Sequence, residues 1–145
     1  MLQQIMIAWD GSRPSHRAFQ VALDLARRYD AELTVLSVAY SPAHAETEAD
    51  RVESVDAARQ YLDQTFDSVR DRAESVGVPL EHVIIEGDHP AEDILRHAHE
   101  HGFDLVVVGH HRNRRTGRFL LHGVAERMIA HAPMPVLVVA DEPEG

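Results

Sequence analysis

The sequence predicts an α/β fold in which five parallel strands form a doubly wound sheet of order 3-2-1-4-5, with helices on both faces. Short β-branched runs alternate along the chain with longer segments of helical period, which is typical of repeated βαβ units. Residues 105–108 are apolar on both faces, as expected of a central parallel strand covered by helices. In this order the loops after the first and fourth strands meet at the topological switch point, where such sheets bind ligands.

The first half of the chain contains two expected strands with a helix between them. The first strand is expected at residues 5–8 and is ended by Asp10 and Gly11, and the second is expected at residues 33–38. Between them, one face of a helix is predicted at Ala18, Ala22, Leu25 and Tyr29.

A loop and a long helix are expected next. Residues 41–49 are polar and contain a proline, so a mobile loop is predicted there. The apolar positions of the long helix recur in steps of three and four, at Val55, Leu62, Phe66, Val69, Ala73 and Val76. The helix stops at Gly77 and Pro79, and residues 83–85 form the third strand.

The last third of the chain adds two helices and two strands. Pro90 opens a helix that Gly102 closes, and a further helical stripe begins at Val124 after the fourth strand. Residues 136–139 form the last strand, and residues 141–145 are expected to be a tail. The sequence shows no repeat or linker, so residues 1–145 are predicted to form one domain.

Composition excludes several classes of function. Fourteen basic residues, all arginine, oppose 24 acidic ones, and a net charge of −10 argues against partners such as nucleic acid or an anionic membrane. The chain has no lysine for a phosphate-binding P-loop or a Schiff base, and no cysteine. With no apolar run of about 20 residues and no signal-peptide pattern, a cytoplasmic location is expected.

Five segments carry a resemblance that covers nearly the whole chain. In order they read IAWDGS, GDHPA, DLVVVG, VAER and APMPVLVV, beginning at residues 7, 87, 104, 124 and 132. Together they resemble the universal stress protein family. The resemblance implies the fold described above, a dimer paired through its last strands, and a role in surviving stress rather than a defined reaction.

Nucleotide binding is the open question that this resemblance raises. The ATP-binding branch of the family is marked by Gly, two residues, Gly, nine residues, then Gly followed by Ser or Thr. Gly109 matches the first glycine, whereas Arg112, His122 and Gly123 replace the other three marker residues. The side chains of Arg112 and His122 either fill the phosphate site or replace the lost backbone contacts with charge. In the second case the anion contacts would also include Arg114, Arg115 and Arg118.

Adenine-nucleotide binding, of ATP or AMP, has a predicted set of residues. By resemblance, Asp10 is placed at the ribose hydroxyls, and Ala8 and Val38 at the adenine edge. The set is completed by Gly109, Arg112, Gly123 and Val124. Asp10 has a simpler interpretation as a turn residue that bonds its own backbone before Gly11.

Other chemistry finds less support in the sequence. His97 and His101 share a helix face and would need a third ligand to hold zinc, and no HExxH pattern accompanies them, so no metal site is predicted. Trp9 is expected in the core or stacked beside the crevice. Asp88, Glu92 and Asp93 are assigned capping and first-turn roles near the N-terminus of a helix. No known catalytic motif is present.

The leading prediction is a non-enzymatic stress-response homodimer that acts through contacts with an unidentified protein partner. Its pairing edge is predicted at Val136, Leu137, Val138 and Val139, which form an apolar edge strand. The first alternative is an adenine-nucleotide sensor with its ligand at the switch point between the first and fourth strands. A slow ATP-hydrolysing enzyme is the second alternative, and no cofactor is certain.

Overall fold

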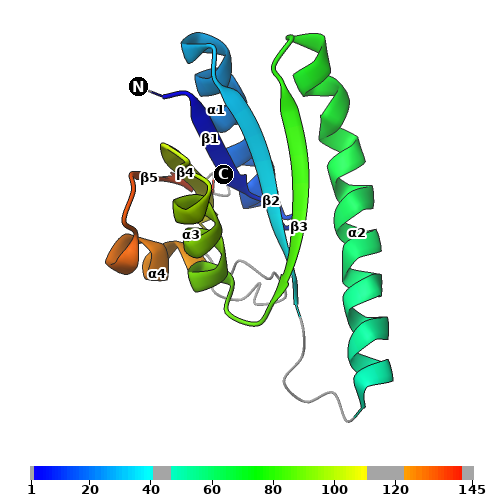
Figure 1. Ribbon diagram of the computed structural model, residues 1–145. Helices are drawn as coiled ribbons and strands as arrows, with labels where there is room; N and C mark the ends of the chain where they lie inside the picture. The colour runs from blue at the N-terminus through cyan, green and yellow to red at the C-terminus, as the bar shows by residue number, and fades with distance from the viewer. Residues whose placement is uncertain (1, 41–46, 111–122, 142–145) are drawn as a thin grey trace.

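A computed structural model describes residues 2–40, 47–110 and 123–141. Strands and helices alternate through the described chain (Figure 1). In order they are β1 (Gln4–Ala8), α1 (Arg13–Tyr29), β2 (Glu32–Tyr40), α2 (Glu48–Ser75), β3 (Leu80–Gly87), α3 (Pro90–Glu100), β4 (Leu105–His110), α4 (Val124–His131) and β5 (Val136–Ala140).

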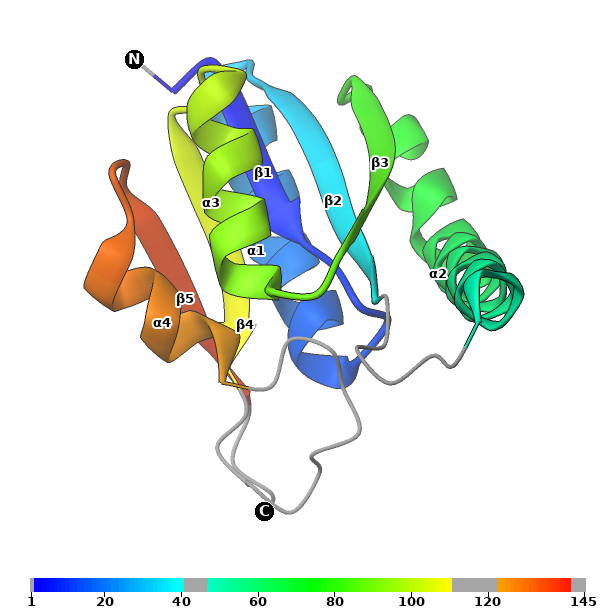
Figure 2. The same ribbon diagram turned by 60° about the horizontal axis from the view of Figure 1, so that its bottom comes forward.

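The five strands form one parallel sheet of order β3-β2-β1-β4-β5, which confirms the predicted topology. Helices α1 and α2 cover one face, and α3 and α4 cover the other (Figure 2). Because side chains alternate across a strand, Ile5 and Ile7 of β1 pack under α1 and α2, whereas Met6 and Ala8 pack under α3 and α4. The strand therefore separates two apolar cores.

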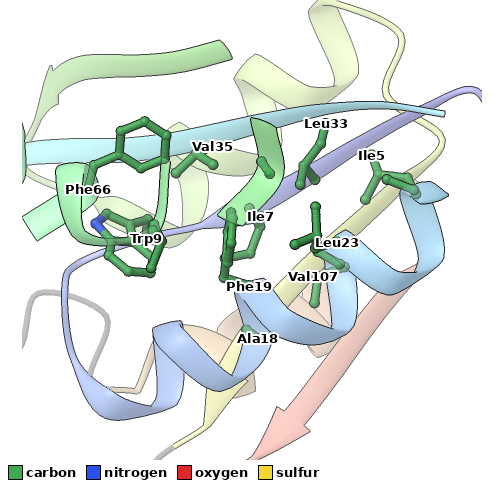
Figure 3. Packing of buried hydrophobic residues seen from close by; sticks show 14 of the residues in the cluster. Ile5, Ile7, Trp9, Ala18, Phe19, Leu23, Leu33, Val35, Phe66 and Val107 are labelled. Atoms are coloured by element: carbon green, nitrogen blue, oxygen red, sulfur yellow. The ribbon is translucent and has the colours of Figure 1, made fainter. Parts of the chain in front are cut away.

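Helix α1 shows where the predicted helical stripe was incomplete. Ala18 and Ala22 are buried as expected, and Phe19 and Leu23 join them in the core (Figure 3). Tyr29 is 58% exposed, so its assignment to the buried face was wrong. It is the last residue of the helix, which ends at Asp30 in the left-handed conformation.

Helix α2 begins earlier than the sequence predicted. The Thr47 hydroxyl accepts a hydrogen bond from the Asp50 backbone N–H at 3.0 Å, which is the pattern of an N-cap. Glu48 and Ala49 are therefore helical, and the prediction of a loop to residue 49 was wrong at its end. The rest of that loop, residues 41–46, lies outside the described residues.

The far end of α2 and the strand after it also differ in their limits. All the predicted apolar positions of α2 are buried except Val76, which lies beyond the helix as its C-cap and is 37% exposed. Strand β3 is longer than the predicted residues 83–85, because its backbone pairs with β2 from Leu80 to Gly87. Within the described residues, no helix has the length and apolar character needed to cross a membrane.

Candidate functional site

The candidate site lies at the carboxyl ends of β1 and β4, the neighbouring strands at which the chain changes direction across the sheet. Strand β1 pairs with β2 on one side and with β4 on the other, so the chain leaves β1 toward one edge and later returns through β4. This end of the sheet comes forward in Figure 2. A crevice at this position is where open α/β sheets bind ligands.

The loop after β1 is organised by its own polar side chains. Asp10 is buried, and its Oδ1 accepts the backbone N–H of Ser12 at 2.9 Å. The Ser12 hydroxyl in turn accepts the backbone N–H of Ser15 at 3.4 Å and so caps α1. Asp10 therefore does act as the turn residue that its position before Gly11 predicted. This role orients its carboxylate at the start of α1.

Trp9 belongs to the core rather than to the wall of the crevice. Its ring is 1% exposed and meets Phe19 and Phe66 edge to face, with centroids 6.1 and 6.4 Å away (Figure 3). The indole N–H donates to the Thr65 hydroxyl at 3.0 Å, which satisfies its only polar atom. Thr65 is also the closest neighbour of Gly11, so helix α2 holds this loop in place.

Three residues of the predicted nucleotide set meet in one apolar cluster. Ala8, Val38 and Val124 are all buried and belong to the core beneath α3 and α4. They come from β1, β2 and the first turn of α4, so only the fold brings them together. The three side chains are packed within this core, and Val124 also lines a small cavity between α3 and α4.

Different structural features explain why glycine occurs at positions 109 and 123 of the predicted nucleotide set. A Cβ at Gly109 would lie 2.4 Å from the backbone oxygen of Pro14, so any side chain there would push α1 away from β4. Gly123 is the N-cap of α4 at φ 76°, a left-handed conformation that glycine adopts without strain. The space around Gly123 is open, so its backbone remains accessible at the start of the helix.

A small cavity opens between the first turns of α3 and α4. Its volume is about 200 Å³, and its lining includes His89, Glu92, Gly123 and Arg127. Arg127 donates to Glu92 Oε1 through Nη2 at 2.5 Å and Nε at 3.1 Å. This pairing holds the pKa of Glu92 below its usual value. One cation, Arg127, and two carboxylates, those of Asp88 and Glu92, thus line the cavity next to two helix N-termini, which favour anions.

The acidic residues at the start of α3 have their predicted roles in part. Glu92 and Asp93 lie in the first turn of the helix, as predicted, and Asp93 Oδ2 accepts the backbone N–H of the N-cap residue His89 at 3.1 Å. Arg96 also donates to Asp93 at 2.7 Å. Asp88 does not cap the helix, because its Oδ1 pairs instead with His89 Nδ1 at 2.7 Å.

His110 joins the end of β4 to α4. Its Nε2 lies 2.6 Å from Glu126 Oε1, so the pair connects the two segments that flank the rest of the predicted loop. The anion-contact candidates predicted from the sequence, Arg112, Arg114, Arg115, Arg118 and His122, lie outside the described residues.

His16 lies beside the loop after β1, on α1. Its ring meets Trp9 with centroids 4.6 Å apart. Burial lowers the pKa of His16 and the charge of Arg72 lowers it further, against an opposing effect of Asp10. A neutral imidazole therefore borders the loop at neutral pH.

A cluster of polar side chains that the sequence did not predict joins β2, β3 and α2. Ser37 Oγ lies 3.1 Å from His82 Nε2, and Asp63 Oδ1 lies 3.6 Å from His82 Nδ1. A cavity of about 530 Å³ adjoins His82 and Asp63. The three residue types match a hydrolytic triad, yet Ser37 is fully buried, so its hydroxyl is not accessible to a substrate carbonyl. Burial lowers the pKa of His82, which favours a neutral, structural hydrogen bond to Ser37.

In the part of the chain that the structure describes, no group of three or more His, Asp or Glu side chains is arranged to hold a metal ion.

The sequence profile described as the universal stress protein family matches residues 1–140. This match covers every described strand and helix.

Individual relatives agree with the family match. A protein of Staphylococcus haemolyticus named as a universal stress protein is 30% identical over 141 residues, which span 97% of this chain and 86% of the relative. A universal stress protein family structure from Burkholderia pseudomallei is 29% identical, with a TM-score of 0.77 and coverage of 95% and 96%. A family member from Arabidopsis thaliana, solved with AMP bound, is 25% identical, with a TM-score of 0.66 and coverage of 97% and 92%.

Proposed function

This chain belongs to the universal stress protein family, and on that premise we propose that it is a non-enzymatic, cytoplasmic regulatory protein that acts as a homodimer through protein contacts. The observation that carries the proposal is the open edge of the sheet at β5. Val136, Leu137, Val138 and Val139 are all partly exposed there, although each is apolar. An exposed apolar edge strand is a surface that native proteins pair or cover.

The backbone of β5 supports strand pairing. Val106 N–H donates to Pro135 C=O and Asp141 N–H donates to His110 C=O, both at 3.0 Å. By the alternation of a parallel ladder, the N–H and C=O groups of Val136 and Val138 then face away from β4. Among the described residues, Arg17 is the one side chain that bonds the backbone of β5, at the Ala140 carbonyl. Within the described residues, the outward backbone groups of Val136 and Val138 have no side-chain partner, which supports their pairing with a second copy of the chain.

The dimer is tested by sedimentation velocity at micromolar concentration. The wild-type chain is expected to sediment as a dimer. Val138→Pro removes an outward N–H without breaking the ladder to β4, so this variant is expected to sediment as a monomer. Sedimentation of the wild type as a monomer would contradict the proposal.

Ile84→Pro is the matched control on the opposite edge of the sheet. Ile84 lies on β3, and its carbonyl also faces outward, where Arg59 Nη1 donates to it at 3.3 Å. We expect Ile84→Pro to remain a dimer. Dissociation of both proline variants would show that the substitution disturbs the sheet in general rather than one pairing edge.

A second function, adenine-nucleotide sensing, is favoured by one specific observation. The Arabidopsis relative is described with AMP bound, and in this chain Ala8, Val38 and Val124 belong to one buried apolar cluster under the switch point. Asp10 follows β1 directly after Trp9, and its bond to Ser12 orients its carboxylate in the loop at that end of the sheet. We propose that AMP or ATP binds there and changes the affinity of the dimer for its protein partner.

Nucleotide binding is tested by a thermal-shift titration with ATP, ADP, AMP and GMP, with and without Mg²⁺. Binding at a hundredfold excess over Kd adds about 2.7 kcal/mol to the free energy of unfolding, which is easily detected. Asp10→Asn keeps an oxygen for the Ser12 N–H and removes the charge, so it is expected to weaken the shift. Asp24→Asn, on the exposed face of α1, is the charge-matched control. No shift at millimolar AMP or ATP would reject this second function and leave the dimer proposal intact.

A further inference from the structure

We propose that His97 and His101 together bind a divalent first-row transition metal ion, with copper(II) bound most tightly, at the C-terminal end of α3. This site is separate from the switch point and does not depend on nucleotide binding. His97 lies in the last turn of α3 and His101 is its C-cap. The pair is therefore on the helix surface, with His101 exposed and His97 partly exposed.

The two imidazoles are already close to a chelating arrangement. Their ring centroids are 4.0 Å apart, and the ring planes differ by only 20°. Metal–imidazole bonds of about 2.0 to 2.1 Å place the two nitrogens about 3 Å apart at the right angle of a tetragonal copper(II) site, and about 3.4 Å apart at the tetrahedral angle of a zinc site. Parallel rings at this spacing need only a small tilt to direct one nitrogen each at a shared ion. Residues four apart on a helix are the spacing at which two ligands act together.

The backbone determines which nitrogen of His101 is available. His101 Nδ1 lies 2.9 Å from the carbonyl oxygen of His97, which can only accept a hydrogen bond. Nδ1 therefore carries the proton, and the lone pair of the neutral ring is on Nε2. A hydrogen bond from the second ring nitrogen to a backbone carbonyl is the usual support for a metal-binding histidine. No described residue forms a hydrogen bond with the ring nitrogens of His97, so a tilt toward His101 breaks no hydrogen bond among the described residues, although the ring centroid also lies 6.5 Å from that of Phe103.

The local charge also favours a cation. The carbonyl end of a helix carries partial negative charge, and the pair lies at that end of α3. The carboxylates of Glu100 and Glu81 both act on His97 with negative charge. Because the described residues offer no third ligand at the site, water or another solvent ligand completes the coordination. Two imidazoles and solvent ligands suit copper(II), nickel(II) and zinc(II), and copper(II) has the highest affinity in this series.

The experiment compares metal binding by variants of a single helix. Isothermal titration with copper(II), and separately with nickel(II) and zinc(II), is carried out at pH 7.5 in a non-chelating buffer. His101→Gln and His97→Gln are each expected to weaken the tightest copper site at least tenfold. His99→Gln removes a histidine from the same helix but from a different face, so it is the matched control and is expected to bind as the wild type does. Binding at other histidines is common to all the variants and does not affect the difference.

Two further measurements make the result decisive. Electron paramagnetic resonance of the one-to-one copper(II) complex is expected to show two imidazole nitrogens in the wild type and in His99→Gln, and one in His101→Gln. Circular dichroism and urea unfolding without metal report whether each variant folds, and the exposed position of His101 makes that variant the safest test. Equal copper affinity in wild type and His101→Gln, or an equal loss in His99→Gln, would overturn the proposal.

Discussion

The two edge strands of the sheet, β3 and β5, are covered very differently. Helix α2 has 28 residues and lies alongside β3, whereas α4 has eight and packs against β5 (Figures 1 and 2). Arg59 donates to the outward carbonyl of Ile84, and Arg51 forms an ion pair with Glu86 at the end of β3. On β5 the one described side-chain contact to the backbone is at Ala140, the last residue of the strand.

The difference between β3 and β5 indicates which edge strand is protected from pairing with another chain. Arginines over a strand edge obstruct the approach of another strand, and Arg59 also bonds the Ile84 carbonyl that such a strand would use. Strand β5 has apolar residues instead, and within the described residues no side chain bonds the outward backbone groups of Val136 and Val138. Helix α4 beside it presents Ile129 to solvent with 67% exposure. Substitutions at and beside the two edges are expected to differ in their effects on stability and association.

The largest expected effect concerns packing beside each edge. Phe66→Ala removes a buried ring of α2 next to β3 and is expected to lower the free energy of unfolding by about 3 to 5 kcal/mol. Leu137→Ala on the half-exposed β5 is expected to cost about 1 to 2 kcal/mol, since less apolar surface is lost. Urea unfolding of both variants in a Val138→Pro background separates folding from association. Equal costs would contradict the asymmetry.

The next effect concerns the buried bond between Ser37 and His82 beside β3. His82→Phe leaves the fully buried Ser37 hydroxyl without this partner and is expected to cost about 1 to 3 kcal/mol. Adding Ser37→Ala removes the unsatisfied hydroxyl and is expected to recover much of that loss. Urea unfolding of the two single variants and the double variant measures the coupling. Additive costs would show that the bond contributes nothing.

The same histidine gives a pH dependence with a defined sign. Burial lowers the pKa of His82 in the folded state below its ordinary value of 6.5, with Arg70 also lowering it and Asp63 and Asp67 opposing. Below pH 6.5 the unfolded chain therefore binds more protons at this residue, so the free energy of unfolding falls as pH falls toward the folded pKa. Urea unfolding between pH 7.5 and 5.5 is expected to show a smaller decrease in His82→Phe than in the wild type. An unchanged slope would assign the effect to other groups.

A smaller effect is expected at the start of the helix that covers β3. Thr47→Ala removes the hydroxyl that caps α2 and is expected to cost about 1 kcal/mol. Thr47→Ser keeps the hydroxyl and is the matched control. Helix α4 has no such contribution to lose, because Gly123 caps it without a side chain. A similar loss in Thr47→Ser would point to the lost methyl group rather than the cap.

The smallest change in stability is expected at the arginines over β3. Arg51→Ala with Arg59→Ala alters exposed or half-exposed side chains and is expected to change stability by only about 0.5 kcal/mol per site. In the monomeric Val138→Pro background, however, this double change opens the β3 edge and is expected to produce concentration-dependent association in sedimentation velocity. Arg28→Ala, in a surface pair with Asp24, is the control that should remain monomeric.

The strand order and most of the core followed from local patterns. Alternating β-branched runs and helical stripes predicted the sheet order, and the apolar run at residues 105–108 predicted a central strand. The errors occur at element ends. Tyr29 follows the helical spacing but lies at the end of α1, and Glu48 follows a polar segment but is helical because Thr47 caps it. The spacing of apolar residues predicts which side of a helix faces the sheet, but it does not predict where along the chain that contact ends.

The candidate site was predictable only in part, for a related reason. Asp10 and Gly11 form a local turn whose hydrogen bond spans two residues, so the sequence alone predicted it. The reason for Gly109 is a contact with the backbone of Pro14, nearly a hundred positions earlier in the chain, and no local pattern contains it. The bonds of Ser37 to His82 and of Trp9 to Thr65 likewise join separate elements.

Residue types and short-range spacing were sufficient to predict the family, the alternation of strands and helices, the turn at Asp10, and the absence of lysine and cysteine chemistry. Each depends on residue type or on short-range spacing, which the chain carries whether or not it is folded. The tertiary structure alone decided which edge is covered, which polar groups meet, and that His97 and His101 stack at the end of α3. These depend on how the packed cores position elements that are distant in sequence.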